Sequence, residues 1–175
     1  MLGPHDLERS DDIENELQEI RGALFDDKIG VLGPADAICL DESATVSEAI
    51  ERMLARRQAG VLVVDGDGRL TGIFTERDVL TRVAGPRRDP LKTRLAEVMT
   101  RDPEALTAGD RIAFAVHCMS VAGYRTVPLV DSQRRPIGVV TVNDVIRWLA
   151  SLFPEAVLNL PPRDALKHPH RMDAG

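Results

Sequence analysis

Two segments of the chain place an aspartate three residues after a threonine, and each pair follows an apolar stretch. The pairs are Thr75 with Asp78 and Thr141 with Asp144. If each threonine begins a helix, its hydroxyl and the exposed backbone N–H groups can bind a phosphate. The carboxylate one turn later can accept hydrogen bonds from both hydroxyls of a ribose, because it offers two oxygens. The spacing therefore suits recognition of a ribose and its phosphate at a helix start.

The same spacing has a purely structural explanation. Thr-x-x-Asp is a variant of the capping box, in which two side chains satisfy backbone N–H groups that a helix start leaves without partners. A single junction of this kind would favour helix capping. Two copies, each after an apolar strand, favour ligand binding.

These junctions belong to a repeat with an offset of 66 residues. Residues 40–80 align without a gap with residues 106–146, and 11 of the 41 aligned positions are identical. Such a match indicates one supersecondary unit used twice, and units of this kind bury their apolar faces against each other. A cleft between the equivalent halves is a natural place for a small ligand.

Each repeat is predicted to follow one order of elements. In the first repeat we expect a strand at 37–40, a helix from the capping sequence 45–48 to Gly60, strands at 61–64 and 70–74, and a last helix at 75–83. The second repeat follows with strands at 127–130 and 137–140 and a last helix at 141–152. The predicted organisation is a helical leader (1–33), repeat one (34–85), a polar linker (86–96), repeat two (97–152) and an irregular tail (153–175).

The leader contains a predicted acidic helix at residues 7–27. Residues 1–30 carry nine acidic and three basic residues, whereas residues 31–150 carry sixteen of each. The sparse apolar stripe of this helix has two explanations. It is either an exposed leader or a helix that packs on a partner or a second subunit.

Composition excludes several classes of protein. The 175 residues carry a net charge of −6 and show no basic footprint for nucleic acid. No run reaches the roughly 18 apolar residues of a membrane span, and the acidic N-terminus lacks a signal-peptide core. We therefore expect a cytoplasmic protein with Cys39 and Cys118 as buried, reduced thiols. No metal-ligand cluster and no catalytic nucleophile–base pair is predicted.

Several motifs together resemble the CBS domain. They are the junctions at 72–80 and 138–146, the segment 124–131 and the lead-in at 98–100. The likeness covers roughly residues 34–151, and two copies make a Bateman module. The resemblance implies an α+β fold of two β-α-β-β-α repeats packed by pseudo-twofold symmetry.

The resemblance also implies a ligand and its contacts. CBS pairs often bind AMP, ADP, ATP or S-adenosylmethionine and, less often, NAD-type molecules, in clefts between the repeats. By this likeness Asp78 and Asp144 would bind ribose hydroxyls, and Thr75 and Thr141 would contact ribose or phosphate. The expected adenine contacts are Ile38, Leu40, Gly60, Val61, Leu106, Val127 and Pro128.

The phosphate partners are expected to differ between the two clefts. Repeat two has Arg125 and Thr126 before its core strand, where repeat one has two uncharged residues. Arg77 in the first junction corresponds to Asn143 in the second. We therefore expect one cleft to bind a phosphorylated adenosine better than the other.

The resulting hypothesis is a homodimeric regulatory or sensor module that takes an adenine nucleotide as its ligand and requires no cofactor. Binding would shift the packing of the repeats and so act on an unidentified protein partner. An adaptor that dimerises without a ligand is the alternative, and a nucleotide-processing enzyme is a third, less favoured one.

Overall fold

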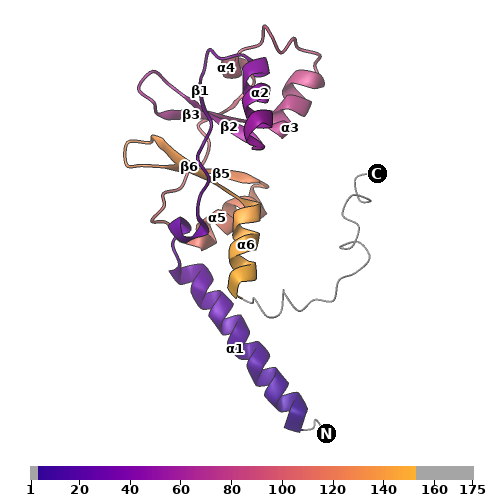
Figure 1. The fold of residues 1–175 in the computed structure, drawn as a ribbon, viewed down its shortest axis with the longest axis vertical. Coiled ribbons are helices and arrows are strands. Elements are labelled where there is room, and N and C mark those ends of the chain that lie inside the picture. The colour runs from indigo at the N-terminus through magenta and orange to yellow at the C-terminus, as the bar shows by residue number, and fades with distance from the viewer. Residues whose placement is uncertain (1–3, 153–175) are drawn as a thin grey trace.

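The computed structural model describes residues 4–152, so the predicted tail at 153–175 lies outside the described residues. Figure 1 shows two similar halves stacked on each other, with a long helix extending from one end. The sheets of the two halves lie in the middle and most helices lie at the outer ends. This arrangement gives four layers in the order helices, sheet, sheet, helices.

The first half contains a four-stranded sheet in the order β1-β2-β3-β4, in which β1 and β2 are parallel and the other neighbours antiparallel. Its elements are β1 (Cys39–Asp41), α2 (Val46–Arg56), β2 (Gly60–Val64), β3 (Leu70–Thr75), α3 (Glu76–Asp78), the π-helix η2 (Val79–Ala84), α4 (Leu95–Val98) and β4 (Thr100–Arg101). The second half consists of α5 (Ile112–Val121), β5 (Thr126–Val130), β6 (Pro136–Thr141) and α6 (Val142–Leu152). Before them come α1 (Pro4–Asp26) and the short 3-10 helix η1 (Ile29–Leu32).

Strand register shows that the two halves are built alike. Val61 pairs with Phe74, and the residues 66 positions later, Val127 and Val140, pair in the same way. Both hairpins also shift register at equivalent places. The gapless repeat in the sequence therefore corresponds to two hairpins of the same geometry.

The halves are joined by exchange of their lead-in segments. β4 begins the second repeat but pairs with β3 of the first, while Ala35 forms an antiparallel bridge to Val139 of β6. Between the sheets lies a small apolar cluster consisting of Leu62, Leu70, Ile73, Val130 and Val139. Each repeat thus completes the other, as expected for units that cannot bury their apolar faces alone.

The boundaries of three elements differ from the sequence-based expectations. The first strand begins two residues later than expected, at Cys39. The left-handed residue that ends α2 is Arg57 (φ 52°), and the prediction that Gly60 ends this helix is wrong. Gly60 instead begins β2, where an added Cβ would lie 3.0 Å from the Phe74 carbonyl oxygen. The last helix of repeat one continues as a π-helix, closed by a 2.9 Å bond from Gly85 N–H to the Leu80 carbonyl.

Part of the expected polar linker belongs to the first core. Thr93 and Leu95 are buried, and Leu95 packs with residues of β2, β3 and α4. Backbone bonds to α2 and the segment before it hold this stretch, with Val46 N–H donating to the Thr93 carbonyl (3.0 Å) and Leu95 N–H to the Ala44 carbonyl (2.9 Å). The polar residues 86–92 concealed this packing in the sequence.

The leader helix α1 packs on its own chain at one end, and packing on a partner or a second subunit stays a prediction. Its C-terminal end packs Ala23 and Leu24 against the second core, together with Ile29 and Leu32 of η1. Leu17 remains 59% exposed, and Figure 1 shows most of the helix extending beyond the body of the molecule. No helix among residues 4–152 combines the length and apolar character that a membrane crossing requires.

The two cysteines occupy different environments. Cys118 is buried and Cys39 is exposed, so the expectation that both are buried is wrong for Cys39. Strand β1 alternates exposed and buried positions, and Cys39 falls on the outer face. Burial and the nearby carboxylate of Glu104 raise the pKa of the Cys118 thiol, which further favours its neutral form.

Candidate ligand-binding cleft

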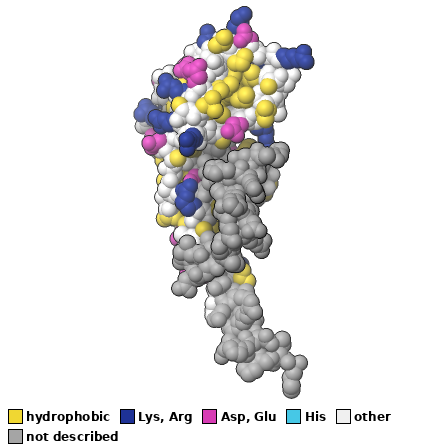
Figure 2. All heavy atoms as spheres, turned by 45° about the vertical axis from the view of Figure 1, so that its right-hand side comes forward, with side chains coloured by type: hydrophobic (Ala, Val, Ile, Leu, Met, Phe, Trp, Pro, Cys, Tyr) yellow, Lys and Arg dark blue, Asp and Glu magenta, His cyan; other side chains and the backbone are white. Residues whose placement is uncertain are grey.

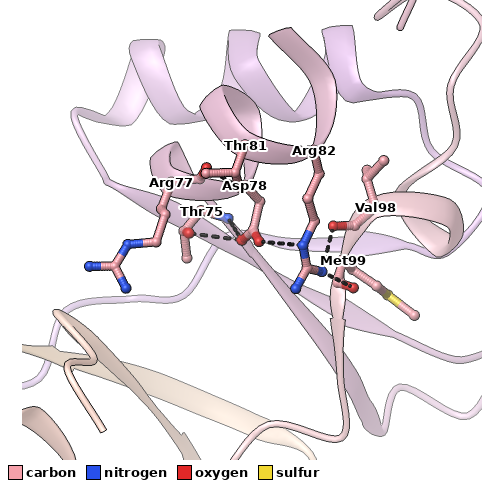
Figure 3. A network of polar contacts seen from close by, with 7 residues as sticks. All are labelled: Thr75, Arg77, Asp78, Thr81, Arg82, Val98 and Met99. Carbon is pink, nitrogen blue, oxygen red and sulfur yellow. Dashed lines mark hydrogen bonds and ion pairs between the residues drawn. The ribbon is translucent and has the colours of Figure 1, made fainter. Parts of the chain in front are cut away.

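The first junction forms a compact network at the start of α3. Asp78 is 7% exposed, and its Oδ2 accepts bonds from the Thr75 N–H (2.9 Å) and the Thr75 hydroxyl (2.8 Å). Its other oxygen, Oδ1, lies 3.3 Å from Nε of Arg82. Figure 3 shows this chain of contacts continuing from Arg82 to the backbone of Val98 and Met99.

The second junction repeats the threonine–aspartate contacts. Asp144 Oδ2 accepts from the Thr141 N–H (2.8 Å) and hydroxyl (2.7 Å), and Asp144 is also 7% exposed. Its Oδ1 pairs with Arg147 (3.1 Å), which lies on the surface. Both junctions therefore form the bonds that the capping explanation requires, and both carboxylates are turned into the protein.

The threonine hydroxyls should contribute equally to the stability of the two halves. We expect Thr75→Val and Thr141→Val each to lower the free energy of unfolding by about 1 kcal/mol, because each removes one bond to a buried carboxylate. Denaturant unfolding monitored by circular dichroism measures the change. A large loss at only one junction would contradict the equivalence of the two caps.

A cavity of about 530 Å³ lies between the halves beside the first junction. Its lining comes mainly from β3, α3 and η2, from β4 and the segment after it, and from β5 with the loop that precedes it. The lining residues are Ala59, Ile73, Thr75, Glu76, Arg77, Asp78, Leu80, Thr81, Arg82, Thr100, Pro103, Glu104, Gly123, Tyr124, Arg125, Thr126 and Pro128. A molecule bound there would touch both repeats.

Six of the residues singled out in the sequence meet in this cavity. They are Thr75, Arg77, Asp78, Arg125, Thr126 and Pro128. Nine others do not line it, namely Ile38, Leu40, Gly60, Val61, Leu106, Val127, Thr141, Asn143 and Asp144. Of these, Ile38, Leu40 and Val61 are buried in the first core.

The cavity brings together two arginines that lie in different repeats. Among the described residues, neither Arg77 nor Arg125 has a carboxylate oxygen within 4.0 Å. In Figure 3 the guanidinium of Arg77 is directed away from Asp78. The residues related to them by the 66-residue offset are Asn143 for Arg77 and Ala59 for Arg125, and Ala59 itself lines this cavity. Each arginine therefore corresponds to an uncharged residue in the other repeat.

Eleven lining residues were missed by the sequence-based reasoning, among them Arg82, Tyr124 and Glu104. Arg82 stands four residues after Asp78, and this spacing is a recognised signal for an ion pair on a helix. Tyr124 is the only tyrosine of the chain and precedes Arg125. Glu104 carried no signal, because its equivalent in the first repeat is the apolar Ile38.

Comparison with known proteins identifies the class of protein. The CBS domain family matches residues 34–85 and 95–151. The chain belongs to the CBS domain family. Its α+β fold of two repeats, predicted from the sequence, is confirmed.

Its relatives include CBSCBSPB2 of Arabidopsis thaliana, which is 35% identical over 113 residues, 65% of this chain and 20% of that protein. MJ1225 of Methanocaldococcus jannaschii is 30% identical over 129 residues, 74% of this chain and 45% of that protein. The chain thus spans less than half the length of these two curated relatives.

Solved structures share the fold. The CBS domain pair of protein MJ0100, in complex with 5′-methylthioadenosine and S-adenosyl-L-methionine, is 24% identical, with a TM-score of 0.64 over 71% of this chain and 97% of that one. The CBS domain protein PAE2072 from Pyrobaculum aerophilum, complexed with AMP, is 22% identical, with a TM-score of 0.64 over 75% of this chain and 95% of that one.

Proposed function

We propose that this protein is a regulatory module that binds an adenosine ligand in the cleft between its repeats. The observation that carries the proposal is the cavity that joins Thr75 and Asp78 of one repeat to Arg125 and Thr126 of the other. Its volume falls in the range of about 300–1,000 Å³ that small-molecule sites occupy. A ligand that spans both repeats favours one packing of the halves, which is how binding would reach a protein partner.

The lining assigns a role to each part of the ligand. The buried carboxylate of Asp78 would accept hydrogen bonds from ribose hydroxyls, as charge-assisted bonds that are stronger than neutral ones. Arg77 and Arg125 would pair with a 5′-phosphate. The base would lie against Tyr124 and Pro128, which present ring and apolar surface to the cavity.

The two arginines favour a phosphorylated ligand over a neutral nucleoside. Among related folds, PAE2072 is complexed with AMP, and MJ0100 is complexed with S-adenosyl-L-methionine. We propose AMP or a related adenine nucleotide as the ligand class. S-adenosylmethionine and NAD are the alternatives that a competition experiment would separate.

Calorimetric titration of the purified protein with AMP tests this proposal. We expect one stronger site, because only the first junction is flanked by both Arg77 and Arg125. Replacing them by their counterparts, as Arg77→Asn with Arg125→Ala, should weaken AMP binding about 10- to 100-fold, since each charge-assisted contact is worth about 1.5–3 kcal/mol at most. The same double substitution should weaken the binding of adenosine much less than that of AMP, because adenosine lacks the phosphate.

Two outcomes would count against this assignment. Equal affinities at two sites in the unmodified protein would contradict the asymmetry of the clefts. An equal loss for AMP and adenosine in the double variant would contradict the phosphate role of the arginines. Failure of every adenine compound to bind would favour an adaptor that works without a ligand. Thermal unfolding gives an independent measure of binding, because a tight ligand at about 100 times its Kd should raise the free energy of unfolding by about 2.7 kcal/mol.

An interaction surface of the first half fits the predicted homodimer. Figure 2 shows hydrophobic side chains gathered on the half of the molecule that α2 and α3 cover. Leu54 of α2 and Leu80 of η2 are 73% and 68% exposed. Exposed apolar patches are typical of protein–protein contacts. The homodimer stays a prediction.

The cytoplasmic location and the absence of catalysis also stay predictions. One relative is named as an enzyme, a homoserine O-acetyltransferase, and its similarity to this chain covers 20% of its own length.

A further inference from the structure

The two junctions differ in how the second carboxylate oxygen is held. Asp78 Oδ1 contacts Nε of Arg82 at 3.3 Å, and the same guanidinium donates through Nη1 to the carbonyls of Val98 (3.0 Å) and Met99 (2.7 Å). These residues are buried in the first core and lead directly into β4. Arg82 therefore joins the proposed ribose acceptor to the segment that crosses between the repeats (Figure 3).

The second junction has no such connection among the described residues. The residue equivalent to Arg82 is Trp148, which packs in the second core. Asp144 is paired instead with Arg147, whose side chain is 72% exposed. Within residues 4–152, the Arg147 guanidinium donates a hydrogen bond to that carboxylate and to no other group. The link from carboxylate to backbone is thus a property of the first cleft.

Counting acceptor sites shows what a ribose would do to this link. An ionised carboxylate offers about four lone-pair positions. Asp78 uses the two on Oδ2 for hydrogen bonds from Thr75, whereas Oδ1 is in ion-pair contact with Arg82 at 3.3 Å. Two ribose hydroxyls would take both positions on Oδ1 and so compete with the Arg82 guanidinium for the same oxygen.

We propose that Arg82 is a positioning residue that couples ligand binding to the segment 98–101. This inference rests on the proposed function. When ribose hydroxyls occupy Asp78 Oδ1, Arg82 is displaced from the carboxylate, its bonds to Val98 and Met99 weaken, and the pairing of β4 with β3 loosens. The ligand thereby changes the contact between the repeats, which β4 helps to form.

Hydrogen exchange of the full chain with and without AMP tests the coupling. We expect AMP to speed amide exchange in residues 98–101 of the unmodified protein. In Arg82→Met the exchange there should already be fast without AMP and should not change on its addition, while AMP binds at least as tightly because its competitor is gone. The matched control is Arg101→Met, which removes an arginine on β4 that donates to the Ala96 carbonyl; it should keep the AMP response.

The outcomes separate this inference from the proposed function. If AMP does not bind the unmodified protein, the proposed function fails and the coupling with it. If AMP binds but residues 98–101 respond alike in the unmodified protein and in Arg82→Met, only the coupling is overturned. Loss of AMP binding in Arg82→Met would also overturn it. Should that variant fail to fold, Arg82→Lys keeps the charge but has one nitrogen in place of the two, Nε and Nη1, that contact the carboxylate and the carbonyls. The same loss of response is expected.

Discussion

Asp78→Asn is expected to weaken AMP binding about 100-fold. The change replaces a charged acceptor by a neutral amide, so the two bonds to the ribose lose their charge assistance. Such bonds are worth about 1.5–3 kcal/mol each, and a total near 3 kcal/mol corresponds to about two orders of magnitude in Kd. Isothermal titration of the variant with AMP measures the effect.

Asp144→Asn is the matched control for this prediction. Both aspartates are 7% exposed, cap a helix through the same threonine contacts and pair with one arginine. The structural cost of the two substitutions should therefore be similar. Only Asp78 lines the cavity with Arg77 and Arg125, so Asp144→Asn should leave the stronger AMP site unchanged. A strong effect of Asp144→Asn alone would move the site to the other cleft.

The repeat made much of the fold predictable. Because the halves are related by a constant offset, one interpretation of the apolar strands and the Thr-x-x-Asp helix starts served for both, and the pairs Val61–Phe74 and Val127–Val140 follow that offset. Errors occurred where a residue has more than one structural use. Glycine both ends helices and permits close backbone approach, and Gly60 serves the second purpose.

The site was predictable only in part, because it is assembled across the repeats. Thr75 and Asp78 lie in one local motif, so their spacing was informative. Arg125 reaches the same cavity from the other repeat, and its proximity to Arg77 depends on the packing of the halves rather than on sequence distance. The π-helix that carries Arg82 also gave no signal, since its hydrogen-bond pattern is not distinguished by apolar periodicity.

Leu95→Ala is expected to lower the free energy of unfolding by about 2–5 kcal/mol, the range found when a large aliphatic side chain is removed from a packed core. Leu95 is fully buried although it lies in a segment whose polar composition indicates a linker. Its backbone N–H is also bonded to the Ala44 carbonyl. Equilibrium denaturation in urea measures the loss as a lower transition midpoint.

Leu91→Ala supplies the matched control, because Leu91 lies four residues earlier and is 72% exposed. Its removal should change stability by less than about 0.5 kcal/mol. Similar small effects of both substitutions would mean that residues 91–98 form a mobile connector. A large effect of Leu95→Ala alone would establish this stretch as part of the first core. Val98 and Met99 would then be anchored in the first core, so that loss of their bonds to Arg82 acts through the pairing of β4 with β3.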